Sequence, residues 1–354
     1  MPRYKPEAWR GKQLFVGVDL HLKKWQVTVL SEDGLKLFSN SIDGNWPSFE
    51  SLLSRFGEAS KVSVVYEAGY FGFWLYDRLV EYGVEARVTP PSLIPSVSGS
   101  RVKTDRIDSL KLAQLLKADQ LKGVYVPTKE ERAHRQVARR RRQLIEDRVR
   151  VQNRIKAHLR VNGIFLPQES SGKWSLGYVD KLRAFRFSDR FEQKSFESLL
   201  EQYDFLCDQV DGQTRLLREL TRTETYEARV EILKSVPGIG WLSAMEILLE
   251  LQDVERFKSA DALAAYVGLT PSQHSSGEHV RYGRITAQGK PSVRALLIQA
   301  AWSLIKKDAL LGKKYQQLKG RAGGKKAIVA IARMLLIRMR RLLISKEPYV
   351  LGVA

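Results

Sequence analysis

The chain has 354 residues, enough for two or three domains, and its single cysteine excludes a disulfide framework or a cysteine-rich zinc site. We expect a cytoplasmic protein without a membrane partner, because the start lacks a signal-peptide core and the longest late apolar run, 327–337, is too short for a membrane span. The formal net charge of +20 favours nucleic acid as the partner.

Residues 1–126 are expected to form an α/β domain, because short strands and helices alternate along them. Apolar runs and period-two alternation predict strands at 14–20, 25–30, 34–40, 61–67 and 84–90. Helical patterns at 46–56 and 71–83 separate the later strands, and a further helix starts at Asp105. This order predicts a mixed sheet with helices on its faces.

Four carboxylates occupy positions in this domain where they can converge. Asp19 ends the first strand, Glu67 ends a later one, and Asp105 and Asp108 share one face at the start of the last helix. Strand ends are where α/β folds present their sites. Several carboxylates at one edge favour Mg²⁺, and paired metal ions can stabilise both reacting oxygens of a phosphodiester. Capping of helix and strand ends is the alternative for each residue alone.

Residues 127–228 are expected to form a helical arm. The segment 129–160 reads as one basic helix, with 12 Lys and Arg against 4 Asp and Glu, a net charge of +8. We expect it to bind nucleic acid through Arg139, Arg140, Arg141 and Arg142. Residues 168–190 look irregular. A second helix then has apolar spacings of three and four, which predict a coiled-coil seam of Phe196, Leu199, Tyr203, Leu206, Val210, Gln213, Leu217 and Leu220.

Residues 229–354 are expected to form a mainly helical domain. Its last part, 301–354, holds 13 Lys and Arg against 2 Asp and Glu, a net charge of +11, and includes Lys325 and Lys326 as candidate nucleic-acid contacts. Residues 237–240, with the sequence PGIG, separate two helical patterns. Gly238 and Gly240 permit a tight hairpin whose backbone amides can face a phosphate, as in a helix-hairpin-helix. An ordinary helix connection is the alternative.

A long polar loop is expected between the helices of this domain, at about 268–290. Ser275 and Ser276 precede a glycine, which would let a phosphate approach the backbone, and a serine here is a candidate nucleophile toward a phosphodiester. His274 is interpreted as a polar loop residue, with a general base as the alternative. Charge to neutralise a phosphate follows at Arg281, Arg284 and Lys290. A flexible surface loop is the competing interpretation.

The order of these motifs resembles a known family. Asp19, Glu67 and the segment KTDRID at 103–108 resemble the RuvC-like branch of the ribonuclease H fold, and more closely the DEDD transposases of the IS110 family of insertion sequences. The C-terminal half resembles the same family through PGIG, then GLTP, a serine directly before glycine, and the basic run GRITAQG. The resemblance covers nearly the whole chain.

The resemblance implies a bridge-RNA-guided transposase of a bacterial insertion sequence. Mg²⁺ would be held by Asp19, Glu67, Asp105 and Asp108, and spacing in the family assigns the nucleophilic serine to Ser276, with Ser275 as its immediate neighbour. The expected partners are donor and target double-stranded DNA and the guide RNA. A homodimer that assembles into a tetramer would form active sites composed of residues from two protomers. The protein would lie in the bacterial cytoplasm, associated with the nucleoid. The resemblance implies three parts: 1–126 RuvC-like, 127–228 arm, and 229–354 transposase domain.

Three other functions remain as alternatives. A RuvC-like nuclease or Holliday-junction resolvase would use the carboxylates without a covalent serine. An actin-like or sugar-kinase ATPase also has a first strand ending like VGVDLH, but its second phosphate loop is not found here. A non-catalytic nucleic-acid scaffold would explain the charge but not the four carboxylates.

Overall fold

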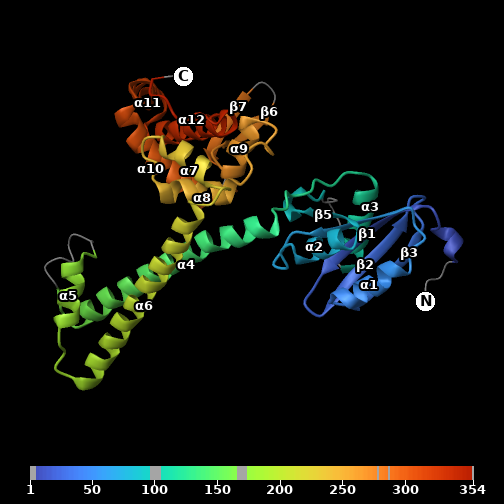
Figure 1. Ribbon diagram of the computed structural model, residues 1–354, viewed down its shortest axis with the longest axis horizontal. Helices are drawn as coiled ribbons and strands as arrows, with labels where there is room; N and C mark the ends of the chain where they lie inside the picture. The colour runs from blue at the N-terminus through green and yellow to red at the C-terminus, as the bar shows by residue number, and fades with distance from the viewer. Residues whose placement is uncertain (1–4, 96–104, 166–173, 277–278, 286–287, 353–354) are drawn as a thin grey trace. The chain divides into compact units, whose positions relative to one another are not determined.

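The computed structural model describes residues 5–95, 105–165, 174–276, 279–285 and 288–352. The chain divides into two compact units, Met1–Val126 and Pro127–Ala354 (Figure 1). Each unit has its own hydrophobic core. They are therefore described one after the other.

A mixed five-stranded sheet forms the centre of the first unit. Its strands are β1 (Gln13–Leu20), β2 (Lys24–Ser31), β3 (Lys36–Asp43), β4 (Lys61–Glu67) and β5 (Glu85–Thr89), in the spatial order β3-β2-β1-β4-β5. The first three strands pair antiparallel, whereas β1 with β4 and β4 with β5 pair parallel. This confirms the predicted mixed sheet.

Helices cover both faces of this sheet. Helices α1 (Trp46–Ser54) and α2 (Trp74–Glu81) contribute Phe49, Leu52, Leu75 and Leu79 to one core together with inward-facing residues such as Val18. Helix α3 (Asp105–Lys117) packs its leucines against Val65 in a separate cluster. Because Val65 directly precedes Tyr66, which belongs to the first core, α3 lies on the opposite face. Two short 3-10 helices, η1 (Pro6–Ala8) and η2 (Pro91–Leu93), complete the described part of this unit.

The close approach of α3 to β1 requires a glycine. A Cβ atom at Gly17 would lie 2.1 Å from the Ser109 carbonyl oxygen and 2.6 Å from the Ala113 nitrogen. The buried hydroxyl of Ser109 also shares a hydrogen bond of 2.9 Å with that of Thr28 on β2. These contacts seat the helix directly over the strand and thereby fix where its N-terminal turn lies.

An antiparallel helix pair begins the second unit. Helix α4 (Lys129–Val161) pairs with α6 (Arg190–Leu220). The two helices are antiparallel, because Arg141 in the first half of α4 contacts Thr214 in the last part of α6, whereas His158 near the end of α4 contacts Glu192 at the start of α6. Five of the eight predicted seam residues of α6 are buried, and Leu200, which the prediction did not include, is buried as well, whereas Phe191, Phe205 and Leu216 are exposed. The buried positions are Phe196, Leu200, Tyr203, Leu206, Val210 and Leu217, while Leu199, Gln213 and Leu220 are half-buried.

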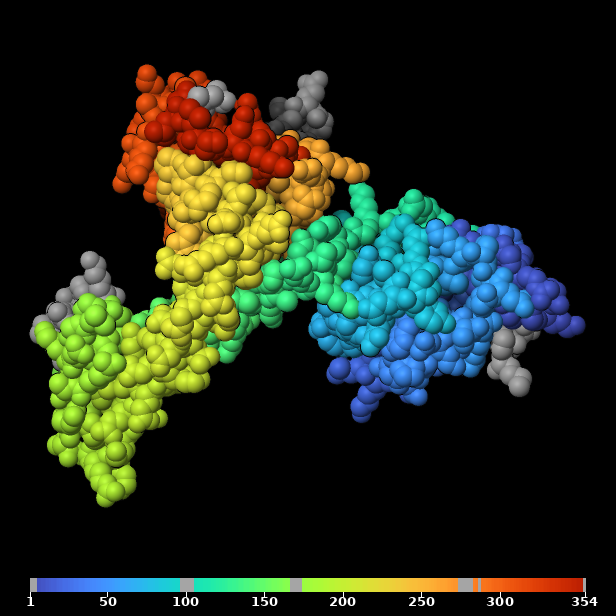
Figure 2. Space-filling model, viewed as in Figure 1, coloured from blue at the N-terminus to red at the C-terminus, as the bar shows by residue number. Residues whose placement is uncertain are grey.

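The expectation of an irregular segment at 168–190 was wrong in its middle. Helix α5 (Leu176–Ala184) forms there and packs beside the end of α4 and the start of α6 (Figure 2). The side chain of Ser175 caps it by accepting a hydrogen bond from the Tyr178 amide, and Tyr178, Val179 and Leu182 are buried. Nine residues give too short a periodic signal to stand out against the surrounding Ser and Gly.

The remainder of the second unit is mainly helical, as predicted. Its helices are α7 (Glu227–Lys234), α8 (Trp241–Leu251), α9 (Ala260–Val267), α10 (Pro291–Lys307), α11 (Ala309–Ala322) and α12 (Gly324–Ser345). Instead of the expected polar loop, β6 (Pro271–Ser276) and β7 (His279–Ile285) form an antiparallel hairpin. Every residue of β6 after Pro271 is polar, so no alternating apolar pattern marked that strand, and backbone hydrogen bonds hold the pair.

Candidate metal centre

The ends of β1 and β4 lie side by side at one edge of the sheet. Val18 pairs with Tyr66 in parallel register, so the next residues, Asp19 and Glu67, are neighbours. Side chains alternate between the faces of a strand, which puts both carboxylates on the face of Gly17, where α3 packs. Both residues are half-buried. Strand pairing therefore brings two of the predicted site residues to one face.

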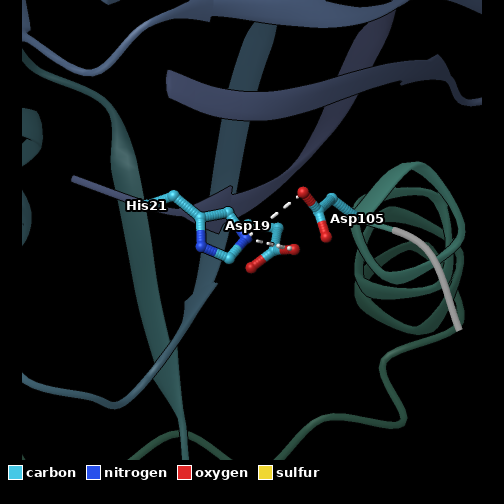
Figure 3. A group of neighbouring side chains, drawn as sticks. All are labelled: Asp19, His21 and Asp105. Atoms are coloured by element: carbon cyan, nitrogen blue, oxygen red, sulfur yellow. Dashed lines mark ion pairs between the residues drawn. The ribbon is translucent and has the colours of Figure 1, made fainter. Parts of the chain in front are cut away.

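The first turn of α3 supplies the third carboxylate. The Asp105 Oδ2 and Asp19 Oδ2 atoms each lie 3.4 Å from the Nε2 atom of His21 (Figure 3). Within the described part of the chain, these three residues form a group whose potential ligand atoms all lie within 4.8 Å of one another. Asp105 is exposed, so the group is open to solvent on the side of the helix.

His21 is a candidate that the sequence analysis did not include. It follows the end of β1, two residues after Asp19, and its imidazole points between the two aspartates (Figure 3). The two-residue spacing was the available signal, because it puts residues 19 and 21 on one face of an extended chain. Magnesium prefers oxygen ligands. The imidazole is therefore better suited to orient Asp19 and Asp105 than to bind that ion.

The electrostatics of the group favour a cation. Burial raises the pKa of the Asp19 carboxyl, and the negative charges of Asp105 and Asp108 raise it further, against the opposing effect of His21. Asp108 therefore acts on Asp19 as part of the same negative field. A divalent cation would relieve this repulsion. Glu67 lies next to Asp19 in the sheet but is not in the group whose ligand atoms meet within 4.8 Å. In type and charge, the four carboxylates fit a hard divalent ion.

The predicted basic run on α4 is largely paired inside the protein. Arg139 forms two hydrogen bonds, of 2.9 and 3.0 Å, with the carboxylate of Glu250, which is 2% exposed. Arg141 and Arg142 lie 3.2 and 3.6 Å from Glu246 on the same helix, α8. Arg140 is exposed. Buried carboxylates therefore engage three of the four arginines, and the contact of this run with nucleic acid stays a prediction.

The two glycines of the PGIG segment have different surroundings. Gly238 has a φ of +91°, and a Cβ there would lie 2.7 Å from the Ser303 Cβ, so packing against α10 already requires a glycine. Gly240 is exposed, has open space around it and is the N-cap of α8, with no side-chain capping hydrogen bond. The amides of this first turn of α8 can therefore face an anion.

The other predicted nucleic-acid contacts lie on α12, β7 and α10. Lys325 and Lys326 are exposed in the first turn of α12, where cations are unfavourable for the helix itself. Arg284 is exposed on β7, and Lys290 lies 3.9 Å from Glu250.

The candidate nucleophile lies at the end of the hairpin. The backbone of Ser276 pairs with His279 at the end of β6, and Ser275 pairs with Val280. The side chains of these serines and of Arg281 lie outside the described part of the structure.

Both halves of the chain match family models of transposases. Residues 16–163, which contain all four carboxylates, match the model of IS110 DEDD transposases. Residues 230–316, which contain PGIG and both serines, match the model described as the transposase IS116/IS110/IS902 family. The chain belongs to the IS110 family of transposases.

Curated relatives of this transposase extend over most of its length. The putative transposase y4qE of Sinorhizobium fredii is 28% identical over 295 residues, 82% of this chain and 72% of the relative. Putative transposase y4rJ of the same organism is 29% identical and covers 92% of this chain and 90% of its own. The transposase for insertion sequence element IS1533 of Leptospira borgpetersenii is 23% identical, with 95% and 97% covered.

Family membership makes this transposase an enzyme that acts on DNA, as the sequence predicted. The DEDD type implies a divalent metal ion, and the group around Asp19 is a candidate acidic site for it. None of the helices in the described residues is both long and apolar enough to cross a membrane.

Proposed function

We propose that this transposase cleaves and rejoins DNA by Mg²⁺-assisted attack of Ser276 on a phosphodiester, guided by a bridge RNA. The observation that carries the proposal is that Asp19 and Asp105 lie close together on one face of the sheet, with Glu67 next to Asp19. The negative charge of Asp108 also acts on Asp19. A fold gains no stability from like charges held together. A metal-dependent reaction explains them.

The first unit is interpreted as a RuvC-like ribonuclease H domain. Three antiparallel strands followed by two parallel ones, in the order β3-β2-β1-β4-β5, support this interpretation. So does the position of the carboxylates at the ends of two adjacent parallel strands and on the helix that covers them. When bound, Mg²⁺ would supply charge to stabilise the reacting oxygens of a phosphodiester. Asp19, Glu67, Asp105 and Asp108 would hold it.

Ser276 is the proposed nucleophile. Its Oγ would form a bond to phosphorus while a bond between phosphorus and a sugar oxygen breaks, and the freed sugar hydroxyl would take up a proton. The product is a phosphoserine link that the hydroxyl of another strand can attack in strand exchange. The serine before glycine within the matched residues 230–316 supports this assignment. Ser275 is adjacent, so both residues enter the test.

Nucleic acid is proposed to contact surfaces that the fold does not use for itself. The candidate contacts are Arg140, the first turn of α8 at Gly240, and the start of α12 at Lys325 and Lys326. PGIG with its flanking helices α7 and α8 is interpreted as a helix-hairpin-helix-like element. The resemblance to the family implies that double-stranded donor and target DNA and a guide RNA share these surfaces.

A dimer that assembles into a tetramer is proposed as the active form. The antiparallel pair of α4 and α6 is interpreted as a coiled-coil arm that would bring the carboxylates of one protomer to the Ser276 of another. The reaction belongs in the bacterial cytoplasm, at the nucleoid.

Covalent trapping tests this function. Wild-type protein, incubated with the element's DNA ends, its flanking non-coding RNA and Mg²⁺, should form a protein–DNA adduct on a denaturing gel. Ser276→Ala should bind both nucleic acids and form no adduct, whereas Ser275→Ala should retain it. Asp105→Asn should also lose the adduct, and mixing it with Ser276→Ala should restore part of it if sites are shared. DNA cleavage by both serine variants, with no adduct from either of them or from the wild type, would rule out the covalent serine and leave a metal nuclease.

A further inference from the structure

Two aromatic side chains occupy the tip of a turn that follows Glu67. The Gly72 amide donates a hydrogen bond of 3.1 Å to the Gly69 carbonyl, which closes a turn with Tyr70 and Phe71 at its centre. Their ring centroids are 4.3 Å apart, with 30° between the planes. Tyr70 is 72% exposed, and Phe71 is half-buried. Such exposure leaves a large apolar ring in water, and the fold gains little from it.

The turn is held in one conformation by the buried Tyr66. The Tyr66 hydroxyl donates to the Gly72 carbonyl at 3.2 Å and accepts from the Tyr76 amide, also at 3.2 Å. On the other side of the turn, the Ala68 amide donates to the Thr89 carbonyl of β5 at 2.7 Å. The aromatic pair is therefore anchored to β4, β5 and α2. A surface fixed in advance loses little conformational freedom when it binds a ligand.

The aromatic pair lies close in the chain to Glu67, one of the four predicted metal ligands. Three residues of chain span at most about 11 Å, which limits the separation between the Cα atoms of Glu67 and Tyr70. Along one DNA strand this distance covers about three nucleotides at 3.4 Å each. A base near a phosphate held by the carboxylates is thus within reach of the Tyr70 ring.

The surroundings of the pair suit a nucleobase better than a protein surface. Gly69 and Gly72 flank it, and neither has another atom within 4 Å of where a Cβ would be, so no side chain stands beside the pair at these two positions. A docking surface for a second protein would need a broader apolar patch. A single exposed ring backed by a second ring offers a flat face of about the size of one base.

We propose that Tyr70, supported by Phe71, stacks on an unpaired base beside the scissile phosphate and acts as a positioning residue. The inference rests on the proposed metal-dependent cleavage of DNA and adds the nucleotide contact to it. Strand exchange requires bases near the cut to leave their old partners, and a ring can hold such a base without reading its identity.

A fluorescent base tests this contact directly. The probe is a forked DNA duplex with 2-aminopurine as the first unpaired base, bound in Ca²⁺ instead of Mg²⁺ to slow cleavage. Wild-type protein should quench the probe through stacking. Tyr70→Ala should remove most of the quenching and weaken binding to the fork by about 5- to 100-fold. Tyr70→Trp should restore both, whereas Tyr70→Leu, which is apolar but lacks a ring, should not.

The matched control is Tyr82→Ala, which removes a tyrosine, 41% exposed, from the same unit. Unchanged quenching and fork affinity in Tyr70→Ala, or an equal loss in Tyr82→Ala, would overturn the inference. A change in oligomeric mass by light scattering, with normal quenching, would show a protein interface instead and also overturn it.

The adduct assay separates this inference from the proposed function. If wild-type protein forms the serine adduct but Tyr70→Ala quenches the probe normally, only the stacking contact is refuted. If wild-type protein forms no adduct and does not cleave DNA, the proposed function fails, and the base contact beside a scissile phosphate fails with it.

Discussion

Arg139 and Glu250 form a bidentate ion pair between α4 and α8, although 111 residues separate them in sequence. The carboxylate of Glu250 is almost fully buried, and its burial alone would raise its pKa. The hydrogen bonds and charge of Arg139, with Lys290 and Arg135 nearby, outweigh that effect and hold the pKa below its usual range. This pair joins the arm to the helical domain.

Removing the arginine should therefore destabilise the protein. Arg139→Met leaves a buried carboxylate without its main partner, so we expect a loss of about 2–3 kcal/mol, at the low end for a broken buried pair because the arginine side chain is 37% exposed. Chemical denaturation measures this loss. Arg140→Met, on the same helix and exposed, should change stability by less than about 0.5 kcal/mol. Equal effects of both variants would contradict a special role for the pair.

Exposed lysines of α12 should contribute to nucleic-acid affinity through counterion release. The double variant Lys325→Gln, Lys326→Gln should bind duplex DNA more weakly and reduce the slope of log affinity against log salt by about 0.9 for each phosphate that is no longer neutralised. Binding titrations between low and moderate salt measure the slope. Lys194→Gln, an exposed lysine paired with Glu197 on the arm, is the control. An unchanged slope would show that α12 does not neutralise a phosphate.

Substitution at Gly17 should disturb both stability and the metal centre. In Gly17→Ala the new Cβ would overlap the Ser109 carbonyl, so α3 must shift, at a cost of about 1–3 kcal/mol. Since α3 carries Asp105 and Asp108, affinity for a divalent ion should fall as well. Gly57→Ala is the matched control, because its nearest neighbour would lie at 3.4 Å. Thermal melts and Mn²⁺ titration together test this prediction, which fails if α3 can accommodate the methyl without either loss.

The affinity of the metal centre should depend on Asp19 and on pH. Asp19→Asn should weaken Mg²⁺ or Mn²⁺ binding by at least about tenfold, because a neutral amide replaces a charged ligand. Because the pKa of Asp19 is raised, protons compete with the metal ion for this carboxylate at acidic pH. The affinity for the metal ion should therefore rise as the pH rises past the pKa of Asp19. Calorimetry at several pH values measures this. Metal binding that is the same in Asp19→Asn would exclude this residue as a ligand.

A buried network at the C-terminal segment should make stability depend on pH at both extremes. Burial raises the pKa of Asp308, but hydrogen bonds from the Tyr349 hydroxyl and the Leu311 and Gly352 amides, with the charge of Arg338, lower it overall. Its stabilisation is therefore present above the unfolded pKa of about 3.9 and is lost as the pH falls below that value.

The tyrosine of this network acts at the other extreme. Burial and the hydrogen bond to Asp308 raise the pKa of Tyr349 to about 12. The neutral form is thus favoured in the folded state, and its stabilisation should disappear as the pH rises from about 10 to 12. Melting temperatures of the wild type and Tyr349→Phe across both ranges test these signs. A variant that keeps the full alkaline loss would show that another group causes it.

Local patterns in the sequence predicted the strands of the five-stranded sheet and the chemical type of the site, but not α5 or the β6–β7 hairpin. Alternating and apolar runs predicted the five strands, because each strand buries one or both faces against a core. The positions of Asp19 and Glu67 at strand ends, and the three-residue spacing of Asp105 and Asp108, predicted a shared acidic face. These features depend on residues close together in the chain, so periodicity alone reveals them.

The tertiary structure alone decided which side chains meet. His21 reaches Asp105 because Gly17 lets α3 approach β1, and no local pattern encodes that distance. The basic run at 139–142 reads as a nucleic-acid surface until α8 folds against it and Glu246 and Glu250 pair with three of its four arginines. Pairing of this kind joins residues more than a hundred positions apart, and it is selected by packing and by the cost of burying an unpaired charge.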